Sequence, residues 1–95
     1  GPSVEGLADA FLRPEAIADL LLQLGRADEA LAAYGDVVRD HPGRARSMLG
    51  AARAARRAGK PEVAREWYER LLVVWAEAEP GTDGLDEARA AVAAR

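Results

Sequence analysis

Apolar side chains recur along this chain every three or four residues, which is the spacing of one face of an α-helix. The pattern divides into four main segments that are separated by turn-forming glycines and prolines. It predicts helices over the ranges 14–24, 27–40, 44–58 and 61–77. A shorter stretch, 85–94, predicts a last helix with Thr82 or Asp83 as its N-cap. The chain is therefore expected to be all-α.

The third and fourth predicted helices differ in the size of their apolar residues. The third presents small or unbranched side chains to the core: Met48, Ala51, Ala52 and Ala55. We expect neighbouring helices to approach it closely. The fourth is apolar on more than one face, which implies contact with two neighbours. Its tryptophans, Trp67 and Trp75, are expected in the core, whereas an exposed one would mark an interface.

A shift of 34 residues places the second pair of predicted helices on the first pair. The shift aligns three pairs of residues: Gly25 with Gly59, Ala30 with Ala64 and Tyr34 with Tyr68. Within each copy the alanine and the tyrosine lie one helical turn apart on the same face. A repeat of this length is typical of stacked helical hairpins, in which each hairpin packs on the next.

The spacing resembles that of the tetratricopeptide repeat, a family with a glycine at the hairpin turn, then an alanine, an aromatic residue and a closing proline. Pro42 closes the first copy, but Ala76 stands at the equivalent place in the second, and the next proline is Pro80. We therefore expect the second copy to end in a helix about one turn longer than the family norm. The resemblance covers residues 12–80 and implies antiparallel helical hairpins stacked in a short right-handed solenoid.

The first two residues, Gly1-Pro2, and this resemblance together divide the chain into five parts. They are a scar of tag removal (1–2), an N-terminal capping segment (3–12), two repeats (13–42 and 43–80) and a C-terminal capping helix (83–95). Segment 3–12 is expected to form a short helix that begins at Ser3 and turns Leu7, Phe11 and Leu12 inward. It is either a native cap or the end of a missing repeat, and the sequence leaves open whether the chain is a piece of a longer protein.

Charge is distributed unevenly along the chain. The net charge is only −3, yet the range 44–60 holds six basic residues and no acidic one. On a helix, positions 46, 49, 50, 53, 56, 57 and 60 form one stripe, opposite the predicted core face. The stripe is rich in arginine, whose planar fork donates two parallel hydrogen bonds to a carboxylate. It therefore favours an acidic ligand.

In the tetratricopeptide repeat, this side of each first helix lines the concave groove in which peptide ligands usually lie. The resemblance therefore implies a partner-binding site made of Arg46, Leu49, Arg53, Arg56, Arg57, Leu22 and Asp19. Leu22 and Leu49 would add apolar contact, and Gly50 would leave room for a ligand backbone. The family's carboxylate clamp is absent, because Arg53 stands where one clamp asparagine would be and Asp19 stands at the matching place in the first repeat.

A second interpretation of the arginine stripe needs no ligand. The basic helix lies between acidic neighbours, namely Glu15 and Asp19 on one side and Asp86 and Glu87 on the other. The arginines could pair with these carboxylates within the domain, at a gain of about 0–1 kcal/mol for each exposed pair. Both interpretations stay open on the sequence.

Few residues could carry catalysis or hold a cofactor. His41 stands beside Pro42 without a metal-ligand or nucleophile partner nearby in the sequence, and is expected at the surface near the negative end of a helix dipole. The chain has no cysteine, and its glycines form no phosphate-binding loop. We expect no enzyme activity, no metal and no cofactor.

The same composition limits the partners and the compartment. No apolar run is long enough to span a membrane, and the acidic net charge argues against nucleic acid as a ligand. The high ratio of arginine to lysine favours a bacterial source. We expect a soluble protein, with the cytoplasm favoured and the periplasm left open.

The predicted function is protein–protein interaction, with an acidic or C-terminal peptide segment of a partner bound in the arginine-lined groove. Two alternatives stay open. The domain could be a structural module that packs on itself, as a homo-oligomer, or on the rest of a longer chain. It could also be an accessory domain of a multidomain enzyme.

Overall fold

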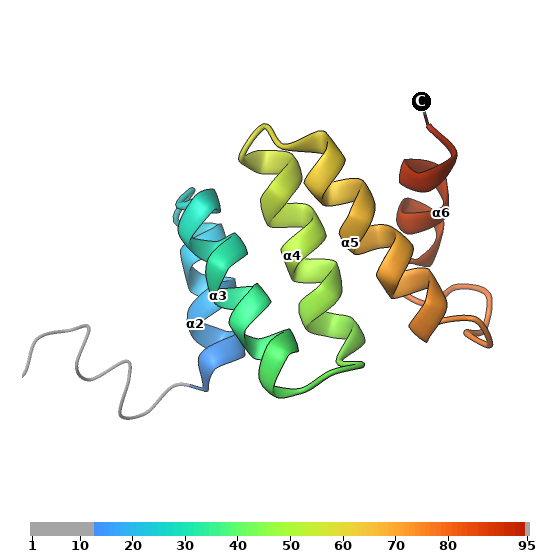
Figure 1. The fold of residues 1–95 in the computed structure, drawn as a ribbon, viewed down its shortest axis with the longest axis horizontal. Helices are drawn as coiled ribbons and strands as arrows, with labels where there is room; N and C mark the ends of the chain where they lie inside the picture. Colours follow the sequence, from blue (N-terminus) through green and yellow to red (C-terminus); the bar gives the residue numbers. More distant parts are fainter. Residues whose placement is uncertain (1–12, 95) are drawn as a thin grey trace, which may run out of the picture.

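The computed structural model describes residues 13–94, and it is all-helical over that range (Figure 1). The helices are α2 (Pro14–Gln23), α3 (Ala27–Asp40), α4 (Ala45–Arg57), α5 (Pro61–Val74) and α6 (Leu85–Ala93). The predicted all-α fold class is confirmed, and each predicted boundary within this range lies within a few residues of the observed one. The short helix predicted for 3–12 lies outside the described residues.

Each helix packs against the next one along the chain, and α2 also contacts α4. In Figure 1 the helices follow one another from α2 to α6 as a row of antiparallel hairpins. The predicted period is visible in the backbone, because α5 begins and ends 34 residues after α3. Residues 13–94 therefore form a short stack of two hairpins followed by a single helix.

The two hairpin turns are alike because each contains a glycine in the left-handed region. Gly25 has φ 79° and Gly59 has φ 75°. This conformation is unfavourable for any residue that has a Cβ atom. After Gly25 the Arg26 amide donates to the Leu21 carbonyl, and after Gly59 the Lys60 amide donates to the Ala55 carbonyl, at 3.0 and 2.9 Å. These bonds satisfy carbonyls at the end of the first helix and reverse the chain direction.

The segment after α5 differs from the prediction. Helix α5 was expected to continue to Glu77, but it ends at Val74 and has the same length as α3. Beyond Val74 the Ala76 amide donates to the Val73 carbonyl, so the backbone tightens to bonds between residues three apart. Without a closing proline at position 76, the chain forms an additional turn after α5, and the helix itself is not longer.

The start of α6 also corrects an expectation. Its N-cap is Gly84 with φ 87°, and neither Thr82 nor Asp83 caps it. The Thr82 hydroxyl instead donates to the Glu79 carbonyl at 2.7 Å, which occupies the side chain in the preceding turn.

The core between α3 and α4 is closely packed because α4 presents small residues. Ala51, Ala54 and the ring of Tyr34 are buried there. A Cβ at Gly50 would lie 2.3 Å from Tyr34 Cε1, so Gly50 makes room for this ring. The expected space for a ligand backbone at Gly50 is therefore filled by the protein itself.

Helix α6 carries charged residues at positions where α4 carries small apolar ones. Ala52 and Ala55 of α4 are fully buried in the core shared with α5. The residues 34 positions later are Asp86 and Arg89, and both are exposed. A further helix packed on α6 as α5 packs on α4 would have to bury these charges, which is unfavourable.

Candidate functional site

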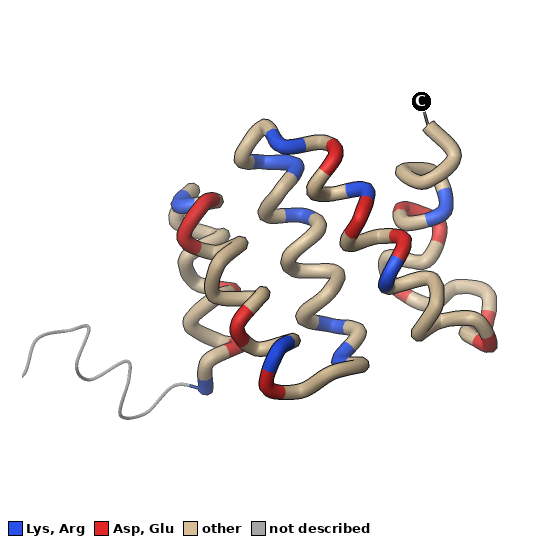
Figure 2. Tube along the Cα trace, in the orientation of Figure 1, with Lys and Arg blue, Asp and Glu red and all other residues tan. Residues whose placement is uncertain are grey.

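Helix α4 carries the arginine stripe, and its neighbours carry most of the carboxylates that face it. Figure 2 shows α4 with basic residues at both ends and no acidic residue. One side of the helix borders a hollow of about 340 Å³. Six of the seven predicted site residues line it: Asp19, Leu22, Arg46, Leu49, Arg53 and Arg57. The structure therefore brings these six residues together, as the pattern predicted.

Two of the predicted arginines already have carboxylate partners within the domain. Arg46 Nη1 lies 2.7 Å from Glu15 Oε1, and Arg46 Nη2 lies 2.7 Å from Asp19 Oδ2. Arg53 pairs with Glu87, with Nη2 2.8 Å from Oε1. For these arginines, the second interpretation of the stripe describes the observed contacts.

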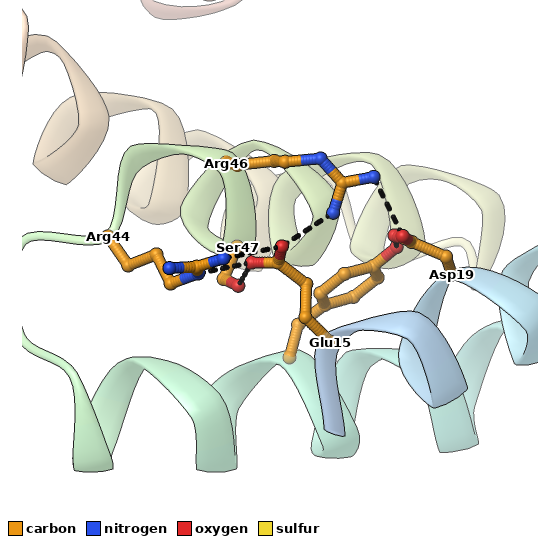
Figure 3. Close-up of polar contacts among 6 residues, drawn as sticks. Glu15, Asp19, Arg44, Arg46 and Ser47 are labelled. Carbon is orange, nitrogen blue, oxygen red and sulfur yellow. Dashed lines mark hydrogen bonds and ion pairs between the residues drawn. The ribbon is translucent and has the colours of Figure 1, made fainter. Parts of the chain in front are cut away.

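Glu15 is the centre of the tightest polar cluster (Figure 3). It is a charged residue with only 8% of its surface exposed. Arg44 donates to it through Nε and Nη2, at 2.6 and 3.0 Å, while Arg46 and the hydroxyl of Ser47 donate as well. The hydrogen bonds from Arg44, followed by those from Ser47 and Arg46, lower the pKa of Glu15 to about 2 despite its burial. Glu15 thus stays ionised and ties α2 to α4.

Glu87 plays the equivalent role between α4 and α6. It accepts hydrogen bonds from Arg53 Nε and Nη2 and from the hydroxyl of Tyr68. The Arg53 hydrogen bonds are the main cause of the lowered pKa of Glu87. Burial and the neighbouring carboxylate raise the pKa of the Tyr68 hydroxyl, which therefore stays protonated and donates.

Sequence reasoning missed the two tyrosine hydroxyls and Ser47. Tyr34 donates to Asp19 just as Tyr68 donates to Glu87. The 34-residue spacing held a signal, because it aligns Asp19, Arg53 and Glu87 on successive first helices. In the sequence, Tyr34 lies between Asp19 and Arg53 and donates to Asp19. Tyr68 lies between Arg53 and Glu87 and donates to Glu87.

Arg56 and Arg57 remain more available than the other arginines of α4. Both are exposed, and neither forms an ion pair with any residue in the described part of the chain. With Arg53 and Glu87 they line a second hollow of about 430 Å³. Arg56 also lies beside the Tyr68 hydroxyl, and this contact raises the pKa of the Arg56 guanidinium.

The two leucines predicted as apolar contacts, Leu22 and Leu49, are less exposed to solvent than Arg56 and Arg57. Leu49 borders the first hollow, but only 6% of its surface is exposed, because the turn before α6 covers it. A Cβ at Gly84 would lie 2.7 Å from Leu49 Cδ2, so this turn fits closely over the leucine. Leu22 is half-buried and is the more accessible of the two.

The sequence also singled out two tryptophans and one histidine, and none of them lines the first or the second hollow. Trp67 and Trp75 are half-buried and pack against the core, and Arg70 lies over the Trp67 ring at 4.3 Å from its centroid. His41 is exposed at the end of α3. Within residues 13–94 no group of three or more His, Asp or Glu side chains is arranged to hold a metal ion. No helix in the same range combines the length and apolar character needed to cross a bilayer.

Comparison with known protein families gives one match. The model of the tetratricopeptide repeat family matches residues 15–81, which include both hairpins. Neither a curated protein nor a solved structure gives a significant match to the chain. Repeats of this family form a non-catalytic fold that generally mediates protein–protein interactions. The match and the repeated hairpins together show that the chain belongs to the tetratricopeptide repeat family.

Proposed function

We propose that this domain binds an acidic peptide segment of a partner protein along α4, with Arg56 and Arg57 as the principal contacts. The observation that carries the proposal is the charge of the second hollow. Its lining holds three arginines and one carboxylate, and that carboxylate, Glu87, is already paired with Arg53. A ligand carboxylate would supply the missing negative charge.

The internal ion pairs give the other predicted residues different roles. Arg46 and Asp19 neutralise each other beside Glu15, so they shape one wall of the groove and contribute little net charge. Arg53 holds α6 through Glu87, and 37% of its side chain remains exposed. A ligand carboxylate next to Arg57 could accept from the Arg53 guanidinium while Glu87 stays bound to it, because a guanidinium has five donors. Leu22 supplies the accessible apolar contact of the first hollow.

The proposal is tested by capture of partners from a lysate of the source organism, at low and high salt. The variant Arg56→Glu/Arg57→Glu reverses two exposed charges and leaves every ion pair of the described residues intact. We expect it to lose a partner that the unaltered domain captures, and we expect salt to weaken that capture because screening acts on exposed charges.

A matched control reverses two exposed arginines elsewhere that form no ion pair with the described residues, as Arg13→Glu/Arg89→Glu, and so changes the net charge equally. Equal capture by the unaltered domain and the Arg56→Glu/Arg57→Glu variant would refute the proposal. Loss of capture in both variants would point to net charge and not to the groove.

A different observation favours association through α2. The 34-residue shift aligns residues of α2 and its C-cap with residues of α4 and its C-cap as follows: Ile17 with Ala51, Leu20 with Ala54 and Leu24 with Ala58. In α4, Ala51 and Ala54 are covered by α3. Leu20 of α2 is 44% exposed and the C-cap Leu24 is 64% exposed to solvent over the described residues. This apolar face is the candidate surface for self-association or for packing on the rest of a longer chain.

Measurement of the mass in solution at increasing protein concentration distinguishes this candidate. A mass that rises for the unaltered domain but not for Leu20→Lys/Leu24→Lys would place self-association at α2. A constant monomer mass would exclude self-association and leave the groove as the proposed site.

A further inference from the structure

A third hollow lies between α5 and α6, outside the residues predicted as the binding site. Its volume is about 380 Å³, within the range of ligand sites in proteins. The buried residues Ala64 and Tyr68 line it, and so do two exposed residues, Ala90 of α6 and Ala94 directly after this helix. The lining is therefore mainly apolar and opens to solvent.

The comparison of the two hairpins explains why this space is open. Leu31 of α3 packs against both core clusters and helps to fill the space beside α4. The residue 34 positions later is Arg65, whose Nε lies 3.1 Å from Glu69 Oε1. A half-buried charged side chain, which pairs with Glu69 and lines the hollow, thus stands in place of an apolar side chain that fills the core. The alanines of α6 are too short to close the gap.

The apolar hollow adjoins the cationic one. Arg56 and Glu87 line both, so the two hollows share a border. On one side of this border lie Arg53 and Arg57, and on the other lie the alanines of α6. A carboxylate and an apolar side chain on one short peptide could reach the two hollows together.

We infer that the partner segment carries a large apolar side chain close to its acidic residue, and that this side chain enters the hollow between α5 and α6. The inference rests on the proposed function, because the acidic residue is the one held by Arg56 and Arg57. The excess of positive charge selects the carboxylate, and the apolar lining selects leucine, isoleucine, methionine or phenylalanine. The hollow would thus act as an anchor pocket for one side chain.

The probe is a display library of short random peptides, selected against the full chain. We expect enrichment of peptides in which an acidic residue lies within a few positions of a large apolar residue. The variant Ala90→Trp fills the apolar hollow with an indole ring at an exposed position. It should keep the selection for acidic residues and lose the selection for the apolar one.

A synthetic peptide with the enriched sequence gives the size of the effect by fluorescence anisotropy. Ala90→Trp should weaken its binding by about tenfold or more, the loss expected when one apolar side chain is no longer buried. The matched control is Ala93→Trp, because Ala93 is exposed on the same helix and does not line the hollow. It should bind as the unaltered chain does.

Each other result has a definite meaning. Enrichment of acidic residues alone, or equal binding by Ala90→Trp and the unaltered chain, overturns the anchor pocket and leaves the proposed function standing. Enrichment of apolar residues without acidic ones, unaffected by Arg56→Glu/Arg57→Glu, overturns the proposed function and the inference that depends on it. No enrichment above background overturns both.

Discussion

Two carboxylates tie α4 to its neighbours, Glu15 from α2 and Glu87 from α6, and they differ in how completely the protein surrounds them. Glu15 accepts from two arginines and a serine, and 10% of its side chain is exposed. Glu87 accepts from one arginine and one tyrosine, and 25% of its side chain is exposed. Both have lowered pKa values, and in both an arginine hydrogen bond is the largest cause.

The difference separates arginines that build the fold from arginines that can meet a ligand. A ligand carboxylate cannot easily displace Glu15, because three donors and two helices hold it in place. The Glu87 pair borders two hollows and leaves its arginine partly exposed. The arginines of one helical stripe therefore differ in how open they are. Those paired with a buried carboxylate are held within the fold, and those paired with a more exposed carboxylate remain accessible.

The largest effect is expected at the closed pair. Glu15→Gln removes the charge but keeps the shape, and should lower the free energy of unfolding by about 2–3 kcal/mol, measured in urea. This value is below the full loss for a buried pair because 61% of the Arg46 side chain is exposed. Glu77→Gln is the control, since Glu77 is exposed on the turn after α5. Equal stability of the two variants would contradict the structural role of Glu15.

The same pair predicts a direction for the pH dependence. The pKa of Glu15 is about 2 in the folded chain against 4.5 for an ordinary glutamate, so the unfolded chain binds the proton more readily. Its contribution is complete above about pH 5 and falls as the pH drops towards 2. Glu15→Gln should lose less stability than the unaltered chain between these values, and parallel curves would refute the assignment.

A smaller effect is expected where the first hairpin meets α4. Gly50→Ala gains about 1 kcal/mol of helix propensity, but its Cβ would lie 2.3 Å from the Tyr34 ring. We expect a net loss of about 1–2 kcal/mol from the overpacking, measured by thermal or urea unfolding. In a Tyr34→Ala background the same substitution should become stabilising. Stabilisation in both backgrounds would show that the close approach costs nothing.

The smallest effect is expected at the open pair. Glu87→Gln should cost about 1 kcal/mol of stability, because its environment is more exposed than that of Glu15. It also releases Arg53, so an acidic peptide should bind a few-fold more tightly, measured by fluorescence anisotropy. A stability loss as large as that of Glu15→Gln would remove the distinction between the two pairs. Weaker peptide binding would mean that Glu87 orders Arg53 for the ligand.

Most of the fold could be predicted because its local signals agree. The bounds of α3, Ala27–Asp40, are those that the pattern predicted, since glycine and proline mark both ends. The end of α5 could not be predicted, because no breaker follows Val74 and the helix stops where the backbone tightens into a turn. Trp67 was expected in the core but is only half-buried, and Arg70 lies over its ring.

The grouping of side chains along one side of α4 could be predicted from the sequence, but the ion pairs that they form could not. The helical stripe was enough to place Arg46, Arg53 and Arg57 at one hollow. Which carboxylate each arginine meets depends on the rotation of α2 and α6 against α4, and spacing along the chain does not fix that rotation. The role of Gly50 depends in the same way on the ring of Tyr34, which comes from a different helix.

The exposed charges of α6 also determine how copies of this domain would behave when joined end to end. A new hairpin placed after residue 94 would find Asp86 and Arg89 where α4 offers Ala52 and Ala55. Burial of both without partners would cost several kcal/mol, so the added hairpin would not dock. Tandem copies should therefore unfold as separate units, and replacement of these two side chains by alanine would remove the charges that oppose docking.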